Sequence, residues 1–296
     1  MKNSVIDPLP GPTRVRLEQT LAQWRHWRCE PGPGSRPEPV KLLGGGISNV
    51  SVLVAARERY VVRIDGMDPE SNGLHRQLEW RALQAASSAQ LAPTPRYFNP
   101  ELGSLVCDYL PPDPVQTQSP GEIGKLLRSI HSLPPLHHRL DLRDRIMRLE
   151  KSIEHRGDTL PILLGDLRDR VLSLIDRLRR EDRSVTLCHN DLLAANRLRS
   201  GGVLWALDWE YCAMGSPWHD LAVTASGDSM NGDETADLLR TYLGRPARPA
   251  ESTRLAEYGR VYRYLELLWY LALQKTGGQG LLEQRAAELA HAWDTH

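Results

Sequence analysis

Apolar and polar positions follow two different periods along this chain. Over most of the first 110 residues they alternate in short runs, whereas beyond residue 120 apolar residues recur every three or four positions. Alternation is typical of half-buried strands, and the longer period of amphipathic helices. The elements expected in the first part are a helix over 14–28 packed on its own lobe, strands over 40–43, 50–55 and 60–64, a helix over 74–86 and a strand over 102–109.

A proline cluster, Pro111, Pro112 and Pro114, ends this first part. The helices expected after it lie over 121–133, 140–156 and 163–180, and the longest of all over 252–275. The pattern predicts an α+β fold with two lobes. The small β-rich N-terminal lobe, residues 1–110, contains an N-terminal helix, an antiparallel sheet and a second helix, and the mainly helical C-terminal lobe, residues 111–296, contains the reactive hairpins.

The most distinctive chemistry lies between residues 187 and 220. An apolar strand at 185–188 leads into His189 and Asp191, and Asn196 begins the next strand. A Ser-Gly-Gly turn at 200–202 then returns the chain through 203–207 and delivers Asp208 beside Asn196. This order suits phosphoryl transfer, with Asp191 orienting a hydroxyl group and Asn196 and Asp208 binding metal, so these three are the candidate catalytic residues. The alternative is that they are ordinary turn-forming residues.

Residues that suit a nucleotide lie upstream. Glycines at 44–46 precede Ser48 and Asn49 between two expected strands, where backbone amides can approach phosphate oxygens. An ordinary glycine-rich hairpin turn is the alternative reading. The candidate phosphate-contacting residues of this loop are Gly45, Gly46, Ser48 and Asn49.

Arg63 occupies the strand on which protein kinases carry the lysine that grips phosphates, and Glu79, on the following helix, is its candidate partner. A solvated helix carboxylate is the alternative for Glu79. The backbone at Asp108 and Tyr109, where the last strand of the small lobe ends, is the expected docking place for adenine.

With these residues in place, the chain resembles the aminoglycoside phosphotransferase and choline kinase superfamily, from about residue 42 to 275. The segments Leu187–Leu192, Leu207–Tyr211 and Asp220–Ala222 look most like bacterial choline/ethanolamine kinases and thiamine kinases. The resemblance implies a two-lobed protein-kinase-like fold, with ATP and Mg2+ as cofactors. It also implies that Asp220 is a buried aspartate that braces the catalytic loop, and His189 is expected to brace the same loop.

The substrate is expected to be an alcohol that carries positive charge. Aromatic residues and carboxylates suit a quaternary ammonium or thiazolium group, and the expected substrate contacts are Asp191, Glu210 and Trp269. Further candidates are Trp209, Tyr211, Trp218, Tyr262, Tyr264, Glu266 and Tyr270. Aromatic residues at helical spacing are equally typical of a core. The resemblance of this helix to that of choline kinases implies a pair of tryptophans. In this chain Ala272 occupies the position of the second tryptophan, which weakens the case for choline itself.

These residues favour an ATP-dependent phosphotransferase acting on the hydroxyl of a small cationic metabolite of the choline, ethanolamine or thiamine type. The nearest alternative is a sugar or amino-sugar kinase, including an aminoglycoside kinase. A catalytically silent nucleotide-binding module is the alternative of another class, and the presence of Asp191, Asn196 and Asp208 together argues against it.

Composition favours a small partner, which agrees with the alcohol and ATP that the resemblance implies. Basic and acidic residues number 37 each, so the charge predicts binding neither to nucleic acid nor to a membrane. The four cysteines show no paired spacing and favour a reducing compartment. No run suits a signal peptide or a membrane span, so a cytoplasmic location is expected. Nothing in the sequence indicates an oligomeric state.

Overall fold

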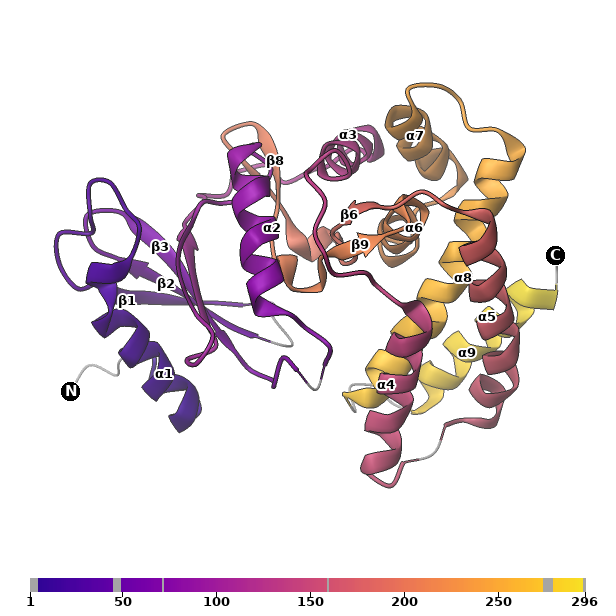
Figure 1. The fold of residues 1–296 in the computed structure, drawn as a ribbon, viewed down its shortest axis with the longest axis horizontal. Coiled ribbons are helices and arrows are strands. Elements are labelled where there is room, and N and C mark those ends of the chain that lie inside the picture. The colour runs from indigo at the N-terminus through magenta and orange to yellow at the C-terminus, as the bar shows by residue number, and fades with distance from the viewer. Residues whose placement is uncertain (1–4, 45–48, 71, 159, 274–278, 295–296) are drawn as a thin grey trace. The chain divides into compact units, whose positions relative to one another are not determined.

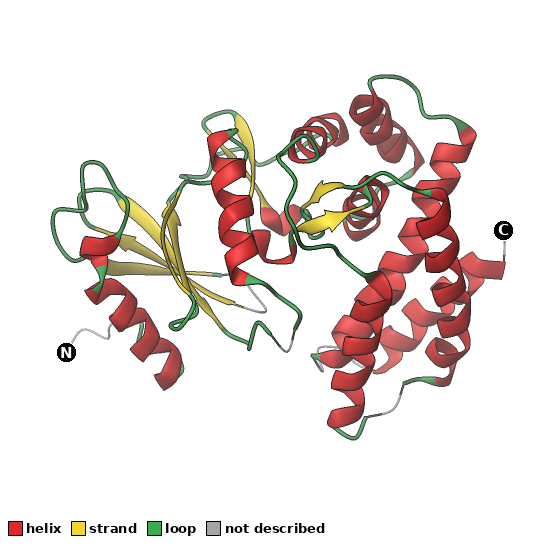
Figure 2. Cartoon of the chain, in the orientation of Figure 1, coloured by secondary structure: helices red, strands yellow, loops and turns green. Residues whose placement is uncertain are grey.

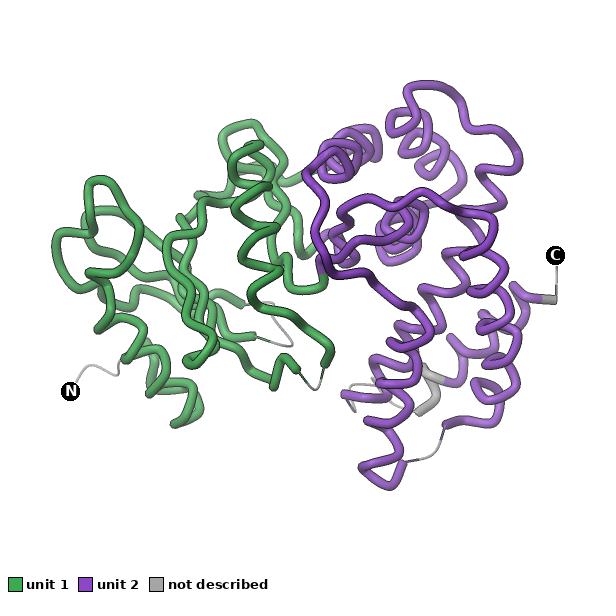
Figure 3. The backbone as a smooth tube through the Cα atoms, in the orientation of Figure 1, with its two compact units in different colours: residues 1–117, 195–211 green, residues 118–194, 212–296 purple. Residues whose placement is uncertain are grey.

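A computed structural model of the chain describes residues 5–44, 49–70, 72–158, 160–273 and 279–294. The chain forms two compact units (Figure 3). Unit 1 comprises Met1–Thr117 and Ala195–Tyr211, and unit 2 comprises Gln118–Ala194 and Cys212–His296. The sequence predicts a C-terminal-lobe position for the hairpin that carries Asp208, whereas the structure groups that hairpin with unit 1. The hairpin belongs to unit 1 because contacts, and not chain order, define a compact unit, and the lobe boundary at residue 110 stays a prediction.

Unit 1 is built on an antiparallel five-stranded sheet of order β1-β2-β3-β5-β4 (Figure 1). Its strands are β1 (Glu38–Leu43), β2 (Asn49–Ala55), β3 (Arg59–Asp65), β4 (Pro95–Asn99) and β5 (Ser104–Asp108). Helices α1 (Gly11–Ala22) and α2 (Arg76–Ser88) lie on opposite sides of this sheet. The short helix η1 (Trp24–His26) follows α1.

The alternation of side chains along β3 determines which residues face each side of the sheet. Val62 and Ile64 are fully buried in the same core cluster as Leu17 and Leu21 of α1. Successive residues of a strand face opposite sides of the sheet, so Arg63 between them points towards the α2 side. The face that carries the candidate phosphate-binding residue is therefore fixed by packing on the other face.

The second part of unit 1 is the hairpin of β7 (Arg197–Ser200) and β8 (Val203–Ala206). Gly201 and Gly202 have φ angles of 60° and 77°, which suit a tight turn that side chains disfavour. Their N–H groups donate to the two carboxylate oxygens of Asp113 at 2.8 and 2.9 Å. The short helices η2 (Ala194–Asn196) and η3 (Trp209–Tyr211) flank the hairpin, and Asp208 lies directly before η3.

Unit 2 is mainly helical (Figure 2). Its helices are α3 (Pro120–Ile130), α4 (Leu142–His155), α5 (Ile162–Glu181), α6 (Pro217–Gly227), α7 (Gly232–Leu243), α8 (Pro249–Ala272) and α9 (Gln279–Asp294). A short antiparallel pair, β6 (Thr186–Cys188) and β9 (Ala213–Gly215), frames the loop that follows β6. Helix α3 packs closely on α7, because a Cβ atom at Gly124 would lie 2.6 Å from the carbonyl oxygen of Leu238.

Two general features bear on the sequence predictions. All four cysteines, Cys29, Cys107, Cys188 and Cys212, carry free thiols. Among the described residues, none of the helices combines the length and the apolar composition that crossing a bilayer requires.

Candidate functional site

Arg63 is the centre of the candidate site in unit 1. From β3 its guanidinium group donates to Glu79 of α2, with Nη2 2.7 Å from Oε2, and to Asp208, with Nη1 2.8 Å from Oδ1. Arg63 and Glu79 are both buried. Burial alone would raise the pKa of Glu79, but Arg63 and then Arg76 reverse the effect and hold that pKa below its ordinary value. The two residues that the sequence pairs are thus in contact, and both are charged.

A second arginine, Arg76, extends this contact into a network. It donates to Asp65 and to Glu79, and its Nη1 lies 3.0 Å from Oε2 of Glu210. Oε2 of Glu210 also accepts from Nδ2 of Asn49 at 2.8 Å. Arg76 is not among the residues predicted from the sequence, although it lies three residues before Glu79 on a helix, a spacing at which side chains meet.

These contacts bear on two candidate residues. Glu210 is buried, and its carboxylate is compensated by Arg76, so it does not fit the role of a contact for a cationic substrate. Asn49 uses its side-chain amide on Glu210 and Arg76, and the backbone contact with phosphate expected of its loop stays a prediction. The other residues expected to contact phosphate, Gly45, Gly46 and Ser48, lie outside the described residues.

The network carries more negative than positive groups. Its carboxylates are Asp65, Glu79, Asp208 and Glu210, and its guanidinium groups are Arg63 and Arg76. Burial and then the charge of Glu210 raise the pKa of Asp208 to about 7, against the opposing effect of Arg63. The carbonyl oxygen of Asn196 accepts from the N–H of Leu207 at 2.8 Å, which keeps the Asn196 backbone beside the residue preceding Asp208. A carboxylate and an amide next to unbalanced negative charge fit a hard divalent cation.

At the end of β5, hydrogen-bonding groups of the two adenine candidates are already used within the protein. The carboxylate of Asp108 forms a bidentate ion pair with Arg96, with both distances 2.7 Å. The N–H groups of Asp108 and Tyr109 donate to the carbonyl oxygens of Thr94 and Arg59. Both candidates therefore use their backbone donors within the sheet.

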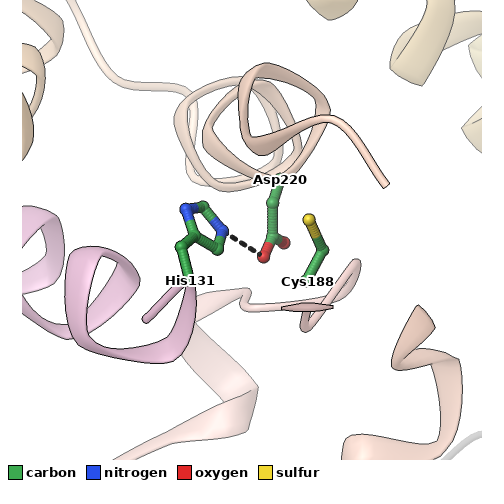
Figure 4. A group of neighbouring side chains, drawn as sticks. All are labelled: His131, Cys188 and Asp220. Carbon is green, nitrogen blue, oxygen red and sulfur yellow. Dashed lines mark hydrogen bonds and ion pairs between the residues drawn. The ribbon is translucent and has the colours of Figure 1, made fainter. Parts of the chain in front are cut away.

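In unit 2, Asp220 holds the backbone of the candidate catalytic loop. From α6 its carboxylate accepts from the N–H groups of His189 at 2.7 Å and Asn190 at 2.8 Å. It also lies 3.0 Å from Nε2 of His131 (Figure 4). Although burial would raise the pKa of Asp220, hydrogen bonding and charge from His131 and His189 hold it below the ordinary value. The loop is thus fixed by a buried, ionised carboxylate.

The group in Figure 4 also meets the distance requirement for a metal site. One donor atom each from His131, Cys188 and Asp220 lies within 4.8 Å of the others. Burial raises the pKa of the Cys188 thiol well above its ordinary value, so the sulfur keeps its proton. Because the Asp220 oxygens already accept hydrogen bonds from the loop and from His131, this group serves the loop and does not resemble a site prepared for a metal.

Asp191 lies next to helix α8 through the loop residue Leu193. The Leu193 N–H donates to the carbonyl oxygen of Asp191 at 2.8 Å. A Cβ atom at Gly227 would lie 2.3 Å from Leu193 Cδ2 and 2.9 Å from the Tyr262 hydroxyl, so these two side chains meet where α6 lacks one. The Tyr262 hydroxyl donates to Glu266 at 3.2 Å. Burial, the charge of Glu266 and then that of Asp191 raise the pKa of Tyr262.

The aromatic candidates divide into core residues and partly exposed ones. Trp209, Trp218 and Tyr264 are buried, and the Tyr264 hydroxyl donates to the carbonyl oxygen of Leu164. Trp269 and Tyr270 are partly exposed and pack edge to face, with ring centroids 5.2 Å apart. Among the candidates on α8, the side chains that keep exposed surface are Tyr262, Glu266, Trp269 and Tyr270.

Comparison with known proteins gives consistent results. The family model described as "Phosphotransferase enzyme family" matches residues 39–268. A choline/ethanolamine kinase family protein from Mesorhizobium loti, whose structure is solved, is 24% identical with a TM-score of 0.71, covering 94% of each chain. The choline kinase LicA from Streptococcus pneumoniae is 23% identical with a TM-score of 0.73, covering 87% of this chain and 95% of that chain. These two structures confirm the kinase-like α+β fold predicted from the sequence.

One curated protein gives a shorter match. Protein LicA from Haemophilus influenzae is 28% identical over 87 residues, which cover 28% of this chain and 33% of that protein. The match thus spans about a third of the relative's length.

Proposed function

The chain belongs to the phosphotransferase enzyme family, and we propose that it is an ATP- and Mg2+-dependent kinase that phosphorylates the hydroxyl of a small cationic alcohol. The structural relative from Mesorhizobium loti, a choline/ethanolamine kinase family protein, favours an alcohol of that type, with thiamine as a further candidate. The observation that carries the proposal is the guanidinium group of Arg63, which contacts Glu79 and Asp208 together. Protein kinases use a basic group that a helix carboxylate orients, close to a metal-binding aspartate. Here Arg63 is the basic group, Glu79 the helix carboxylate and Asp208 the aspartate.

In this proposal, unit 1 holds the nucleotide and the metal. Arg63 contacts the phosphates of ATP, and Glu79 fixes its orientation. Asn196 and Asp208 are the metal ligands, and the excess of carboxylates around them attracts a divalent cation. When bound, Mg2+ supplies electrostatic stabilisation of the charge on the transferring phosphoryl group. Free thiols and the use of ATP suit the cytoplasm as the location.

Leu110, directly after the candidates Asp108 and Tyr109, is the residue that we propose for the adenine contact. The N–H groups of Asp108 and Tyr109 already donate within unit 1, and Pro111 and Pro112 have no N–H group. Leu110 lies between them and is partly exposed at the end of the sheet. We assign adenine recognition to its backbone N–H.

Unit 2 supplies the group that acts on the alcohol. Asp191 orients the substrate hydroxyl and accepts its proton, in a loop whose backbone Asp220 holds. Glu266 and Tyr262 lie on the adjacent face of α8, so the negative charge of Glu266 and the rings of Trp269 and Tyr270 suit a cationic head group.

The test is a phosphoryl-transfer assay with ATP and Mg2+ on choline, ethanolamine, thiamine, sugars and aminoglycosides. We expect transfer to at least one of the small cationic alcohols, and loss of transfer in Asp191→Asn and Asp208→Asn. The exposed Asp169→Asn serves as a matched control with wild-type rates. Transfer to sugars or aminoglycosides alone would replace the proposed substrate class, and binding of ATP without transfer to any acceptor would show a silent module.

A further inference from the structure

An arginine from the C-terminal helix lies on the face of α8 assigned above to the substrate. Tyr262, Glu266 and Tyr270 are spaced by four residues on α8, so they share one face of that helix. The Cζ atom of Arg285, on α9, lies 5.5 Å from the ring centroid of Tyr270, within the range of a cation–π contact. The partly exposed ring of Tyr270 thus already faces a cation from this chain.

The charge of Arg285 also reaches Glu266. Burial raises the pKa of Glu266, while Arg285, the Tyr262 hydroxyl and Arg263 act in the opposite direction. Arg285 is first among the groups that oppose the effect of burial. The carboxylate that would attract a cationic head group is therefore partly compensated from within the protein.

Helix α9 holds Arg285 in place through contacts elsewhere along its length. Ala286 and Leu289 are buried. The guanidinium groups of Arg170 and Arg260 lie 5.6 and 5.7 Å from the ring centroid of Trp293, near the end of α9. Arg285 is therefore presented by a packed helix, and its contact with Tyr270 does not depend on a loose tail.

We propose that Arg285 is a specificity-determining residue, a cation of the protein that competes with the head group of a cationic substrate for Tyr270 and Glu266. This inference rests on the proposed function, because it takes the α8 face next to Asp191 as the alcohol site. A monocation bound beside Tyr270 is repelled by the guanidinium charge of Arg285 and shares the ring and Glu266 with it, and both effects weaken cation binding. A neutral alcohol of the same shape has no such competition.

The experiment measures binding by calorimetry to the full chain and to Arg285→Ala. The two probes are choline and its neutral carbon isostere, in which a tert-butyl group replaces the trimethylammonium group. Since a cation–π contact at a partly exposed site is worth enough to change an equilibrium by about two- to thirtyfold, we expect the Kd for choline to fall by that factor in Arg285→Ala. The Kd for the isostere stays unchanged, and Arg285→Lys, which keeps the charge, remains close to wild type.

Two further variants separate charge from loosening of the helix. Arg260→Ala removes a contact with Trp293 and leaves Arg285 in place, so we expect wild-type affinity for choline. In a Glu266→Gln background the gain from Arg285→Ala shrinks, because the two charges act on each other. An unchanged Kd for choline in Arg285→Ala, or an equal gain for the isostere or in Arg260→Ala, would overturn the inference.

The outcome also distinguishes this inference from the proposed function. If the wild-type protein phosphorylates choline and Arg285→Ala leaves the KM unchanged, the function stands and the role of Arg285 is rejected. If no alcohol is phosphorylated but tetramethylammonium binds more tightly to Arg285→Ala than to wild type, the function is rejected and the competition stands. If neither variant binds any cation, both are rejected.

Discussion

Replacing Glu79 with alanine should destabilise unit 1 more than the loss of one surface ion pair would. Glu79 contacts two buried guanidinium groups, with Oε1 2.5 Å from Nη1 of Arg63 and Oε2 2.8 Å from Nη1 of Arg76. Only 3% of its side chain is exposed, so no water replaces the missing carboxylate without rearrangement. Both arginines have pKa values above the ordinary value, so they stay charged instead of releasing a proton.

The size of the effect follows from the charge left behind. Removing one partner of a buried ion pair costs about 3–5 kcal/mol, because the remaining charge keeps its desolvation penalty and loses its compensation. Asp208 and the other carboxylates of the network still face the arginines, which places our expectation at the lower end, about 3 kcal/mol. This is a large share of the roughly 5–15 kcal/mol by which a domain is stable.

The assay is urea unfolding followed by circular dichroism and tryptophan fluorescence. Glu18→Ala is the matched control, since Glu18 pairs with Arg36 in the same unit and the two side chains are 43% and 46% exposed. An exposed pair contributes at most about 1 kcal/mol. If Glu79→Ala lowers the free energy of unfolding by no more than Glu18→Ala does, the network is not held by this carboxylate, and the reasoning about Arg63 fails with it.

The remaining predictions concern pH, packing and turnover. Burial, and then the charge of Arg145, lower the pKa of His219 from 6.5 to about 4. The unfolded chain therefore binds the proton more readily, and the contribution of His219 to stability should fall by about 3 kcal/mol as pH drops from 6.5 to 4. The difference in free energy of unfolding between wild type and His219→Gln, measured in urea across this range, should change by that amount and checks the prediction. Gly124→Ala should lower the free energy of unfolding by about 1–3 kcal/mol, because the new methyl group meets the carbonyl oxygen of Leu238; a midpoint equal to wild type would contradict it. In steady-state assays Asp208→Ala should lose at least as much kcat as the matching variant of Asp191, because metal electrostatics outweigh proton removal; near-normal turnover of Asp208→Ala would contradict this.

Much of unit 1 follows from local sequence. The apolar run around Val62, Arg63 and Ile64 predicts the strand, and the structure confirms it as β3. The two glycines at 201 and 202 predict the hairpin that places Asp208. These features are local, because strand period and turn conformation depend on neighbouring residues.

What the sequence does not predict depends on contacts between distant residues. Strand β4 is missed because it is a short edge strand that begins with Pro95 and carries polar Arg96 and Asn99. Proximity to Asp208 suggests a substrate role for Glu210, but its side chain lies with Arg76, from which it is separated by 134 positions along the chain. Only the fold decides which charge a buried carboxylate meets.

The path of the backbone between the units has a consequence for synthesis and for dissection of the molecule. Unit 1 is completed by Ala195–Tyr211, after 77 residues of unit 2, Gln118–Ala194, have already emerged. A ribosome must therefore deliver Tyr211 before the first unit is whole, even though the unit starts at the N-terminus. For the same reason, a fragment cut after Thr117 lacks the Asp208 segment, and experiments on an isolated first unit require that segment to be supplied as a peptide or by fusion.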